Sequence, residues 1–231
     1  MSVITSQDLP CEVKLVRNKR ARRFTLRLDK HGPGAVLTVP PNVPEHECHS
    51  FLVRHSDWLT RTLAKQPPTV DVCPGAEIPV DGELLRIVAS EGRRGPTSVD
   101  GTQLIVRGGG SVGVRVAAWL KERARARLNP AARGYAQALD REVKAVALRD
   151  TTSRWGSCSR NGTLSFSWRL AMAPVDVQEY VAAHEAAHLV EMNHSDRFWA
   201  TVERLMPDWR VHRDWLRREG PGLHAYRFDR S

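Results

Sequence analysis

Two histidines four residues apart, in the segment His184-Glu185-Ala186-Ala187-His188, restrict the fold and the chemistry more than any other part of this sequence. On an α-helix, residues at this spacing lie on one face with their Cβ atoms about 5–6 Å apart, so both imidazoles can bind one metal ion. The glutamate between them stands beside the ion without binding it, and can accept a proton from a metal-bound water. The segment therefore predicts a helix that carries part of a catalytic zinc site.

The residues around this segment favour a helix over 175–191. Pro174 suits the first turn of a helix. Val177 and Val181 share one helical stripe with the two histidines, which therefore continue a buried face. Neutral imidazoles on such a face need a partner, and a metal ion is one. The alternative is an ordinary helix with two satisfied histidines and a solvated glutamate.

His194 is the candidate for a third ligand. It follows His188 by six residues, and on an unbroken helix it would lie about 240° around the axis from His188, so the helix must end between them. Asn193 tolerates the left-handed conformation that ends helices, and Ser195 can cap the next helix. Glu191 is the competing third ligand. Three protein ligands and one open position are typical of catalytic zinc.

The first part of the chain has a different pattern. Short alternating segments bounded by glycine and proline predict a β-rich N-terminal region over residues 1–110, with one helix over 44–65. The run Gly108-Gly109-Gly110 marks the expected boundary with the rest of the chain. Hydrophobic residues make up 41% of the sequence, which is enough for a buried core and excludes a disordered chain.

The second region, 111–231, is expected to be mostly helical. An apolar stripe predicts a helix over 112–139 that is interrupted near Pro130. The turn signal Asn161-Gly162 predicts a small antiparallel β-hairpin over 154–168. Strands followed by helices are typical of an α+β fold. Further elements are expected as a strand over 143–149 and helices over 175–191, 195–206 and 208–218.

The chain carries 35 lysine and arginine residues against 26 acidic ones, a formal net charge of +9. The basic stretches lie at 17–23, 121–127 and 210–218. They fit either a surface that binds nucleic acid through its phosphates or an ordinary solvated surface. No apolar run approaches the roughly 20 residues that span a bilayer. No signal peptide is visible, so we expect a cytoplasmic protein without a membrane partner.

The four cysteines form no C-x-x-C pair, which argues against a thiolate zinc site. In a chain without a signal peptide we expect them to be free thiols. Cys158 is closest to the predicted site. Its thiol is either a buried free thiol or a switch that displaces the catalytic water from zinc.

Several longer motifs surround the predicted site. They are Arg154-Trp155-Gly156-Ser157-Cys158-Ser159, Phe166-Ser167-Trp168-Arg169-Leu170, the segment from Tyr180 to Leu189, Asn193-His194-Ser195 and Phe198-Trp199. Together they resemble the YgjP-like metallopeptidase family, which is related to the SprT-like and other short zinc peptidases. The resemblance is close over about residues 150–209 and looser over the rest of the chain. At Ala186, family members often carry leucine, and both residues are apolar.

The resemblance implies that the second region is zincin-like, with a zinc ion (Zn²⁺) held by His184, His188 and His194. It implies that Glu185 is the general base. It also implies that the hairpin over 155–168 is the edge of a small sheet beside the helix, where an extended peptide binds through main-chain hydrogen bonds. The expected substrate is a peptide or protein. The candidate substrate-binding residues are Trp155, Gly156, Ser157, Phe166 and Arg169.

Other residues near these motifs have two possible roles. A tetrahedral oxyanion needs a further hydrogen-bond donor, for which the candidates are Arg154, Arg169 and Tyr180. The alternative for each is a structural role. Large aromatic side chains either line substrate pockets or belong to the core, and these are Trp155, Trp168 and Trp199.

The sequence thus predicts a zinc-dependent metallopeptidase that hydrolyses peptide bonds with a zinc-bound water activated by Glu185. The alternative is a basic, nucleic-acid-associated binding module with a structural or vestigial zinc site. Glu185 favours the enzyme, because a purely structural zinc site has no need of a general base.

Overall fold

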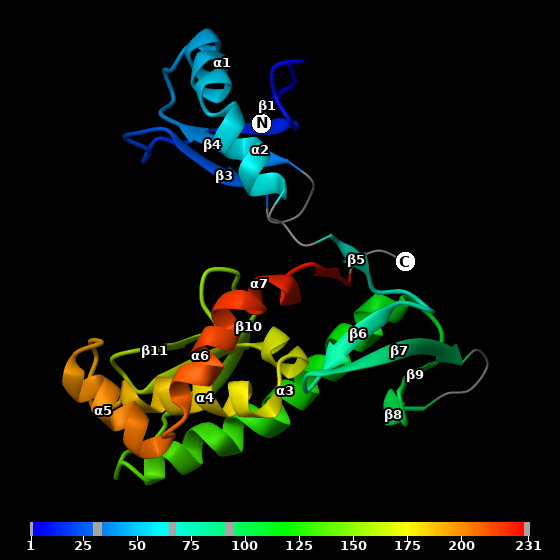
Figure 1. Ribbon diagram of the computed structural model, residues 1–231, viewed down its shortest axis with the longest axis vertical. Coiled ribbons are helices and arrows are strands. Elements are labelled where there is room, and N and C mark those ends of the chain that lie inside the picture. Colours follow the sequence, from blue (N-terminus) through cyan, green and yellow to red (C-terminus); the bar gives the residue numbers. More distant parts are fainter. Residues whose placement is uncertain (1, 30–33, 65–67, 91–94, 229–231) are drawn as a thin grey trace. The chain divides into compact units, whose positions relative to one another are not determined.

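The computed structural model describes residues 2–29, 34–64, 68–90 and 95–228. The chain divides into two compact units, Met1–Gln66 and Pro67–Ser231, which are described separately (Figure 1). The sequence placed this division at residue 110 instead. The strands between residues 70 and 107 share one buried core with the helices that follow, which places them in the second unit. The predicted α+β class is confirmed, since a β-rich start precedes a mostly helical part.

The first unit is a four-stranded sheet with two helices. The sheet has the order β1-β2-β4-β3, and β2 and β4 are its one parallel pair among the described strands. The helix predicted over 44–65 is divided at His55, whose φ of −108° and ψ of 11° leave the helical range. Lys65 lies outside the described residues. The elements are β1 (Ser2–Ile4), β2 (Val13–Arg17), β3 (Thr25–Leu28), β4 (Ala35–Val39), α1 (Glu45–Arg54) and α2 (Ser56–Ala64).

The second unit begins with a four-stranded sheet of order β6-β7-β9-β8. Its central strands β7 and β9 are parallel, and the outer pairs are antiparallel. Alternate residues such as Ile78, Val80, Leu85 and Ile87 are buried in the core that the sheet shares with the helices. The strands are β5 (Val70–Asp71), β6 (Glu77–Val80), β7 (Glu83–Ser90), β8 (Ser98–Asp100) and β9 (Gln103–Arg107), and β5 pairs with β13 (Tyr226–Arg227).

The long helix α3 (Val112–Gln137) continues through Pro130, so the predicted interruption there is wrong. A proline inside a helix removes one backbone hydrogen bond and costs about 3 kcal/mol. The buried stripe of α3 extends on both sides of the proline, from Leu128 to Ala132 and Ala136. Packing of this stripe against the rest of the core offsets the local cost. Ser111 caps the helix by accepting a hydrogen bond from the backbone of Val114.

A small three-stranded sheet of order β10-β12-β11 lies next in the chain. The predicted hairpin is present, because β11 (Gly156–Cys158) and β12 (Thr163–Ser167) are antiparallel. The third strand, β10 (Ala145–Arg149), runs parallel to β12, so the sheet is mixed rather than purely antiparallel. β11 is an edge strand of this sheet.

The helix α4 (Val175–Ala187) is the centre of the second unit. It packs against α3, α5 (Asp196–Leu205), α6 (Trp209–Arg218) and β11 (Figure 1). Its alanines are fully buried, and such small side chains allow these elements to approach closely. The helix ends at Ala187 and not at residue 191 as predicted. The N–H groups of Leu189 and Val190 instead donate to carbonyls three positions back, which forms tighter turns. Two short elements complete the unit, η1 (Trp168–Met172) before α4 and α7 (Gly220–Leu223) after α6.

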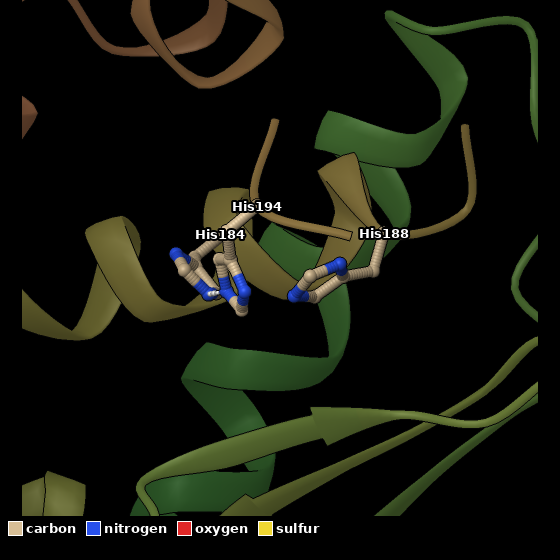
Figure 2. Close-up of side chains that lie close together, drawn as sticks. All are labelled: His184, His188 and His194. Carbon is tan, nitrogen blue, oxygen red and sulfur yellow. Dashed lines mark hydrogen bonds between the residues drawn. The ribbon is translucent and has the colours of Figure 1, made fainter. Parts of the chain in front are cut away.

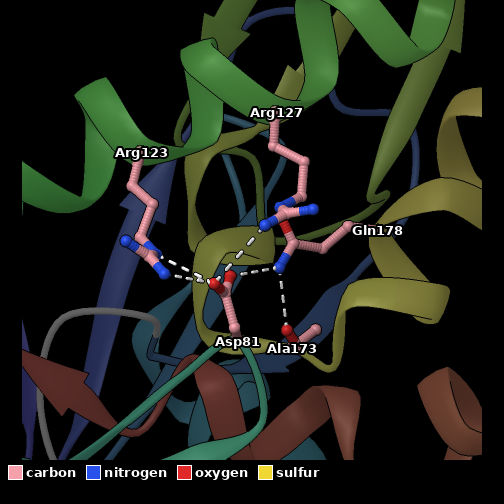
Figure 3. Close-up of polar contacts among 5 residues, drawn as sticks. All are labelled: Asp81, Arg123, Arg127, Ala173 and Gln178. Atoms are coloured by element: carbon pink, nitrogen blue, oxygen red, sulfur yellow. Dashed lines mark hydrogen bonds and ion pairs between the residues drawn. The ribbon is translucent and has the colours of Figure 1, made fainter.

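Asp81, in the turn between β6 and β7, anchors the larger sheet to α3 and α4 (Figure 3). Its carboxylate accepts hydrogen bonds from Arg123 Nε at 2.9 Å and from the Gln178 amide at 2.8 Å. Arg127 Nη2 lies 3.8 Å from the same carboxylate. Gln178 is fully buried and also donates to the carbonyl of Ala173 at 2.9 Å. The cluster thus joins the sheet to the helix that carries the two histidines.

Replacing Asp81 with alanine is expected to lower the free energy of unfolding of the second unit by about 3 kcal/mol, because two arginines and a buried amide lose their shared acceptor. Urea denaturation followed by circular dichroism measures this loss. Glu83→Ala is the matched control, since it removes an exposed carboxylate from the same hairpin. It should change the free energy by less than about 0.5 kcal/mol. Equal effects of the two variants would contradict the anchoring role.

Candidate metal centre

Three histidines converge at the C-terminal end of α4 (Figure 2). Their ligand nitrogens all lie within 4.8 Å of one another, and Nε2 of His184 is 3.2 Å from Nε2 of His194. His184 lies in the last turn of α4 and His188 is its C-cap, whereas His194 comes from the segment before α5. Among the described residues, this is the one group of three or more histidine, cysteine or acidic side chains with metal-binding spacing.

The chain reverses between His188 and His194 through side-chain hydrogen bonds. Asn193 does not have a positive φ, so the expected left-handed conformation is wrong. Its side-chain oxygen instead accepts a hydrogen bond from the backbone N–H of Ser195 at 2.9 Å. Ser195 in turn is the N-cap of α5, and its hydroxyl accepts from the backbone N–H of Phe198. The predicted break in the helix is therefore present, and it lets His194 face the other two histidines.

Phe198, in the first turn of α5, contacts all three imidazole rings. Its side chain is fully buried. Its ring stacks on His188 with 4.4 Å between ring centroids, and it meets His184 and His194 edge-to-face at 4.9 and 4.7 Å. Aromatic contacts of this kind hold rings in fixed directions. The capping of α5 thus positions both the third histidine and the ring on which the site rests.

Hydrogen bonding at His188 and burial at His184 favour neutral rings with a free nitrogen lone pair. Nδ1 of His188 lies 3.0 Å from the main-chain carbonyl of Glu191, and since only an N–H can bond to that oxygen, Nε2 keeps its lone pair for a metal. Glu191 therefore meets the site through its backbone, and its carboxylate is not among the converging donors. Burial, with the neighbouring His188 and His194, lowers the pKa of His184 to about 3, so this ring is neutral at pH 7.

Glu185 is the buried carboxylate beside the histidines. It is 5% exposed, and within the described part of the chain its Oε2 has no hydrogen-bond partner. Burial raises the pKa of Glu185 to about 8, and the charge of Arg154 opposes this rise. Gly156 of β11 allows the carboxylate to fit, since a Cβ there would lie only 2.6 Å from Cγ of Glu185. The close contact between β11 and α4 thus requires a glycine at this position.

A cleft of about 530 Å³ opens over the histidines and Glu185. It lies between the edge strand β11 and helix α6, and α4 supplies residues between them. Its lining combines apolar side chains with a small number of charged and polar groups, as ligand clefts commonly do. The lining residues are Arg154, Trp155, Gly156, Ser157, Cys158, Tyr180, Val181, His184, Glu185, His188, Met192, His194, Arg213, Leu216 and Arg217.

A family model of the YgjP-like metallopeptidase domain matches residues 22–219 of this chain. The chain belongs to the YgjP-like metallopeptidase family. Among solved structures, the crystal structure of the metallopeptidase zymogen of Pyrococcus abyssi abylysin is 21% identical, with a TM-score of 0.31 over 45% of this chain and 95% of that chain. A comparison with curated proteins found no match. The predicted family is thus confirmed, and with it a metallopeptidase role for the chain.

The cleft of this YgjP-like metallopeptidase contains three of the five candidate substrate-binding residues. Trp155, Gly156 and Ser157 line it. Phe166 pairs with Gly156 across the small sheet. It is 1% exposed and belongs to the core, so it borders the site from behind β11.

Arg169, the fifth candidate, is not among the residues that line the cleft. Its guanidinium pairs with Asp150 at 2.8 Å. It also donates hydrogen bonds to the carbonyls of Leu223 and Tyr226, at 3.1 and 3.0 Å. The structure therefore places Arg169 where it ties the C-terminal segment to the core, away from the three histidines.

The other candidates divide between the cleft and the core. Arg154 and Tyr180 line the cleft, and the Tyr180 hydroxyl lies 3.4 Å from Nδ1 of His184. Trp168 is buried in the core, and Trp199 stacks on a neighbouring tryptophan beneath the site. Cys158 lines the cleft as a free thiol. Burial and the charge of Glu185 raise the pKa of Cys158 to about 11, so its sulfur is protonated at pH 7.

Five lining residues were not predicted from the sequence as site residues: Val181, Met192, Arg213, Leu216 and Arg217. The last three have the spacing of one helical face, which the sequence shows. That this face turns toward the histidines depends on the packing of α6 against α4. The sequence therefore indicates that these three residues share one helical face, but it does not indicate that this face packs toward the histidines.

Several arginines of the basic stretches on the helices form ion pairs within the protein. Arg123 and Arg127 of α3 pair with Asp81, and Arg210 of α6 pairs with Glu203 at 2.9 Å. These pairs favour a solvated surface, and the alternative prediction of nucleic-acid binding receives no support from them. None of the helices in the described ranges is long and apolar enough to pass through a bilayer.

Proposed function

We propose that this metallopeptidase is zinc-dependent, with His184, His188 and His194 as the zinc ligands and Glu185 as the general base. The observation that carries the proposal is the convergence of three imidazoles beside one buried carboxylate with an unpartnered oxygen. A carboxylate in such a position costs free energy unless it has a charged or hydrogen-bonding partner. This free-energy cost is explained if Glu185 is the general base beside a bound metal ion.

The donor set fits zinc. Neutral imidazole nitrogens are common zinc ligands, and three of them leave a fourth position open for water or substrate, as in catalytic sites. When bound, zinc lowers the pKa of a coordinated water and polarises the carbonyl of the scissile peptide bond. The bond from His188 to the Glu191 carbonyl and the floor formed by Phe198 orient the ligands before the metal arrives.

Glu185 holds and moves the proton. A dication held by the three histidines would favour the ionised form of Glu185 and so oppose the effect of burial on its pKa. Its free Oε2 then accepts the proton of the attacking water. The same oxygen can deliver that proton to the nitrogen of the leaving amine. Gly156 packs against this side chain and limits its movement.

The edge of β11 is the expected peptide-binding surface. Ser167 N–H donates to the carbonyl of Trp155, and Ser159 N–H donates to the carbonyl of Thr163, so these odd-numbered positions of the strand face β12. Gly156 and Cys158 therefore direct their main-chain groups away from β12, toward the open edge. An extended substrate can pair with this edge by main-chain hydrogen bonds, which are independent of its sequence.

Removal and return of the metal test the zinc dependence. Dialysis against a chelator such as 1,10-phenanthroline is expected to abolish cleavage of a mixed peptide library, because no chain residue replaces the Lewis acid. Addition of zinc should restore cleavage, whereas magnesium should not, because it prefers oxygen ligands. Cleavage that persists in metal-free protein would contradict the proposal.

A further inference from the structure

A second hollow, of about 250 Å³, borders the cleft on the other side of the edge strand. It shares Arg154, Gly156 and Ser157 with the cleft, so the two hollows meet along β11. Nothing in the reaction described above uses this second hollow. Its remaining lining residues are Arg149, Thr151, Ser165 and Phe166.

The register of the small sheet shows which face this hollow occupies. Gly156 faces Glu185 of α4, so its cross-strand partner Phe166 points to the same, buried face. Side chains alternate along a strand. Ser157 and its partner Ser165 therefore point to the opposite face, away from α4. The second hollow thus meets the side chains of Ser157 and Ser165 on the face of the sheet that α4 does not cover.

The charged groups of this hollow are all cationic. Arg149 and Arg154 form no ion pair with any described residue, although Arg154 is close enough to Glu185 to affect its pKa. No acidic side chain lines the hollow among the described residues. The nearest acidic residue in sequence, Asp150, is already paired with Arg169. The hollow therefore offers two guanidinium groups and two serine hydroxyls to an acceptor from outside.

A substrate strand along β11 would bring a side chain to this hollow. Successive side chains of an extended peptide point to opposite faces of the sheet that it joins. If one residue points into the cleft beside the histidines, its neighbour points to the face where Arg149 and Ser165 lie. A carboxylate accepts hydrogen bonds from guanidinium groups in pairs, and such charged bonds are stronger than neutral ones.

We propose that this second hollow is a subsite that selects an aspartate or glutamate side chain of the peptide substrate, with Arg149 and Arg154 as its cationic donors. The inference rests on the proposed function, since it needs a peptide bound along β11. The size of the hollow suits one side chain better than a nucleic-acid strand, whose phosphates repeat along an extended path. It makes Arg149 a specificity-determining residue that does not touch the reacting atoms.

Two pools of degenerate peptides test the subsite. They are identical except that the acidic pool carries Asp and Glu where the neutral pool carries Asn and Gln. Zinc-loaded wild-type protein is expected to consume the acidic pool about tenfold faster. Mass spectrometry of the products should show acidic residues enriched at one position near the cleaved bond. Equal rates without enrichment would overturn the proposal.

A charge reversal gives the sharper comparison. Arg149→Glu is expected to remove the acidic preference and to favour a pool with Lys and Arg at the same positions. Arg149 is exposed, so the variant should keep the thermal midpoint of the wild type. The matched control is Arg160→Glu at the exposed hairpin tip, which lines neither hollow. A control that loses the preference as fully as Arg149→Glu would show a general charge effect and no subsite.

Binding separates this proposal from the proposed function. The Glu185→Gln protein, loaded with zinc, is mixed with fluorescent acidic or neutral pools and followed by anisotropy. Tighter binding of the acidic pool, lost in Glu185→Gln with Arg149→Ala, supports the subsite even if no peptide is cleaved. Equal binding overturns it. A single-stranded DNA oligonucleotide that binds more tightly than the acidic pool, through Arg149, would also overturn it in favour of nucleic-acid recognition.

Discussion

Replacing Glu185 with glutamine is expected to lower kcat by about 10²–10⁴-fold while the protein keeps its metal, because the amide cannot accept a proton from water. Glutamine has nearly the same shape as glutamate, and the Glu185 side chain packs directly against Gly156. The substitution therefore removes the proton acceptor without opening a gap. Rates on a cleavable library peptide and the zinc content of the same samples measure the two effects.

The control for this variant is Glu83→Gln, which makes the same chemical change at an exposed position far along the chain from the histidines. It should leave kcat unchanged. Activity of the Glu185→Gln protein within a factor of three of wild type would show that another group removes the proton. Loss of zinc together with activity would instead make Glu185 a ligand or a structural support.

Replacing His188 with alanine is expected to lower zinc affinity by more than about 100-fold, beyond the 10–100-fold loss typical of residues that only orient a ligand. Two imidazoles remain, and the fourth position was open to solvent, so the ion would keep too few protein donors. Elemental analysis of purified protein should give about one zinc per chain in the wild type, as one site predicts, and almost none in the variant. His46→Ala, an exposed histidine of the first unit, should leave the content unchanged.

The same measurement decides the third ligand. We expect His194→Ala to lose zinc and Glu191→Gln to keep it, because the Glu191 carboxylate is not among the donors that converge. The opposite pattern would exchange their roles. Wild-type protein that contains no zinc, and takes up none when it is added, would contradict the metal site itself.

Much of the site depends on residues that are close in the sequence. The helix that carries the two histidines, the break before His194, the cap at Ser195 and the Asn161-Gly162 hairpin were each predictable, and each is present. Helical spacing, capping and turn propensities act over a few residues, so a local pattern contains them. The motifs that indicate the family lie in the same segments.

Local sequence patterns were less informative where two backbone conformations have similar free energies. Pro130 and Asn193 both favour a break or a left-handed turn, yet α3 continues through the first, and side-chain hydrogen bonds turn the chain at the second. In α3, the buried face on both sides of the proline offsets the lost backbone bond. Contacts from elsewhere in the chain decide such cases, as expected when propensity and packing compete.

By itself, the sequence determined the α+β class, the helix with its paired histidines and the family to which the chain belongs. Only the tertiary structure placed the first sheet of the second unit with the helices, turned Arg213 into the cleft and Arg169 away from it, and set Glu185 against Gly156. Each of these depends on which faces pack together across large separations in the chain. Periodicity shows that a face is apolar or charged, but close packing of the whole core selects the partner that covers it.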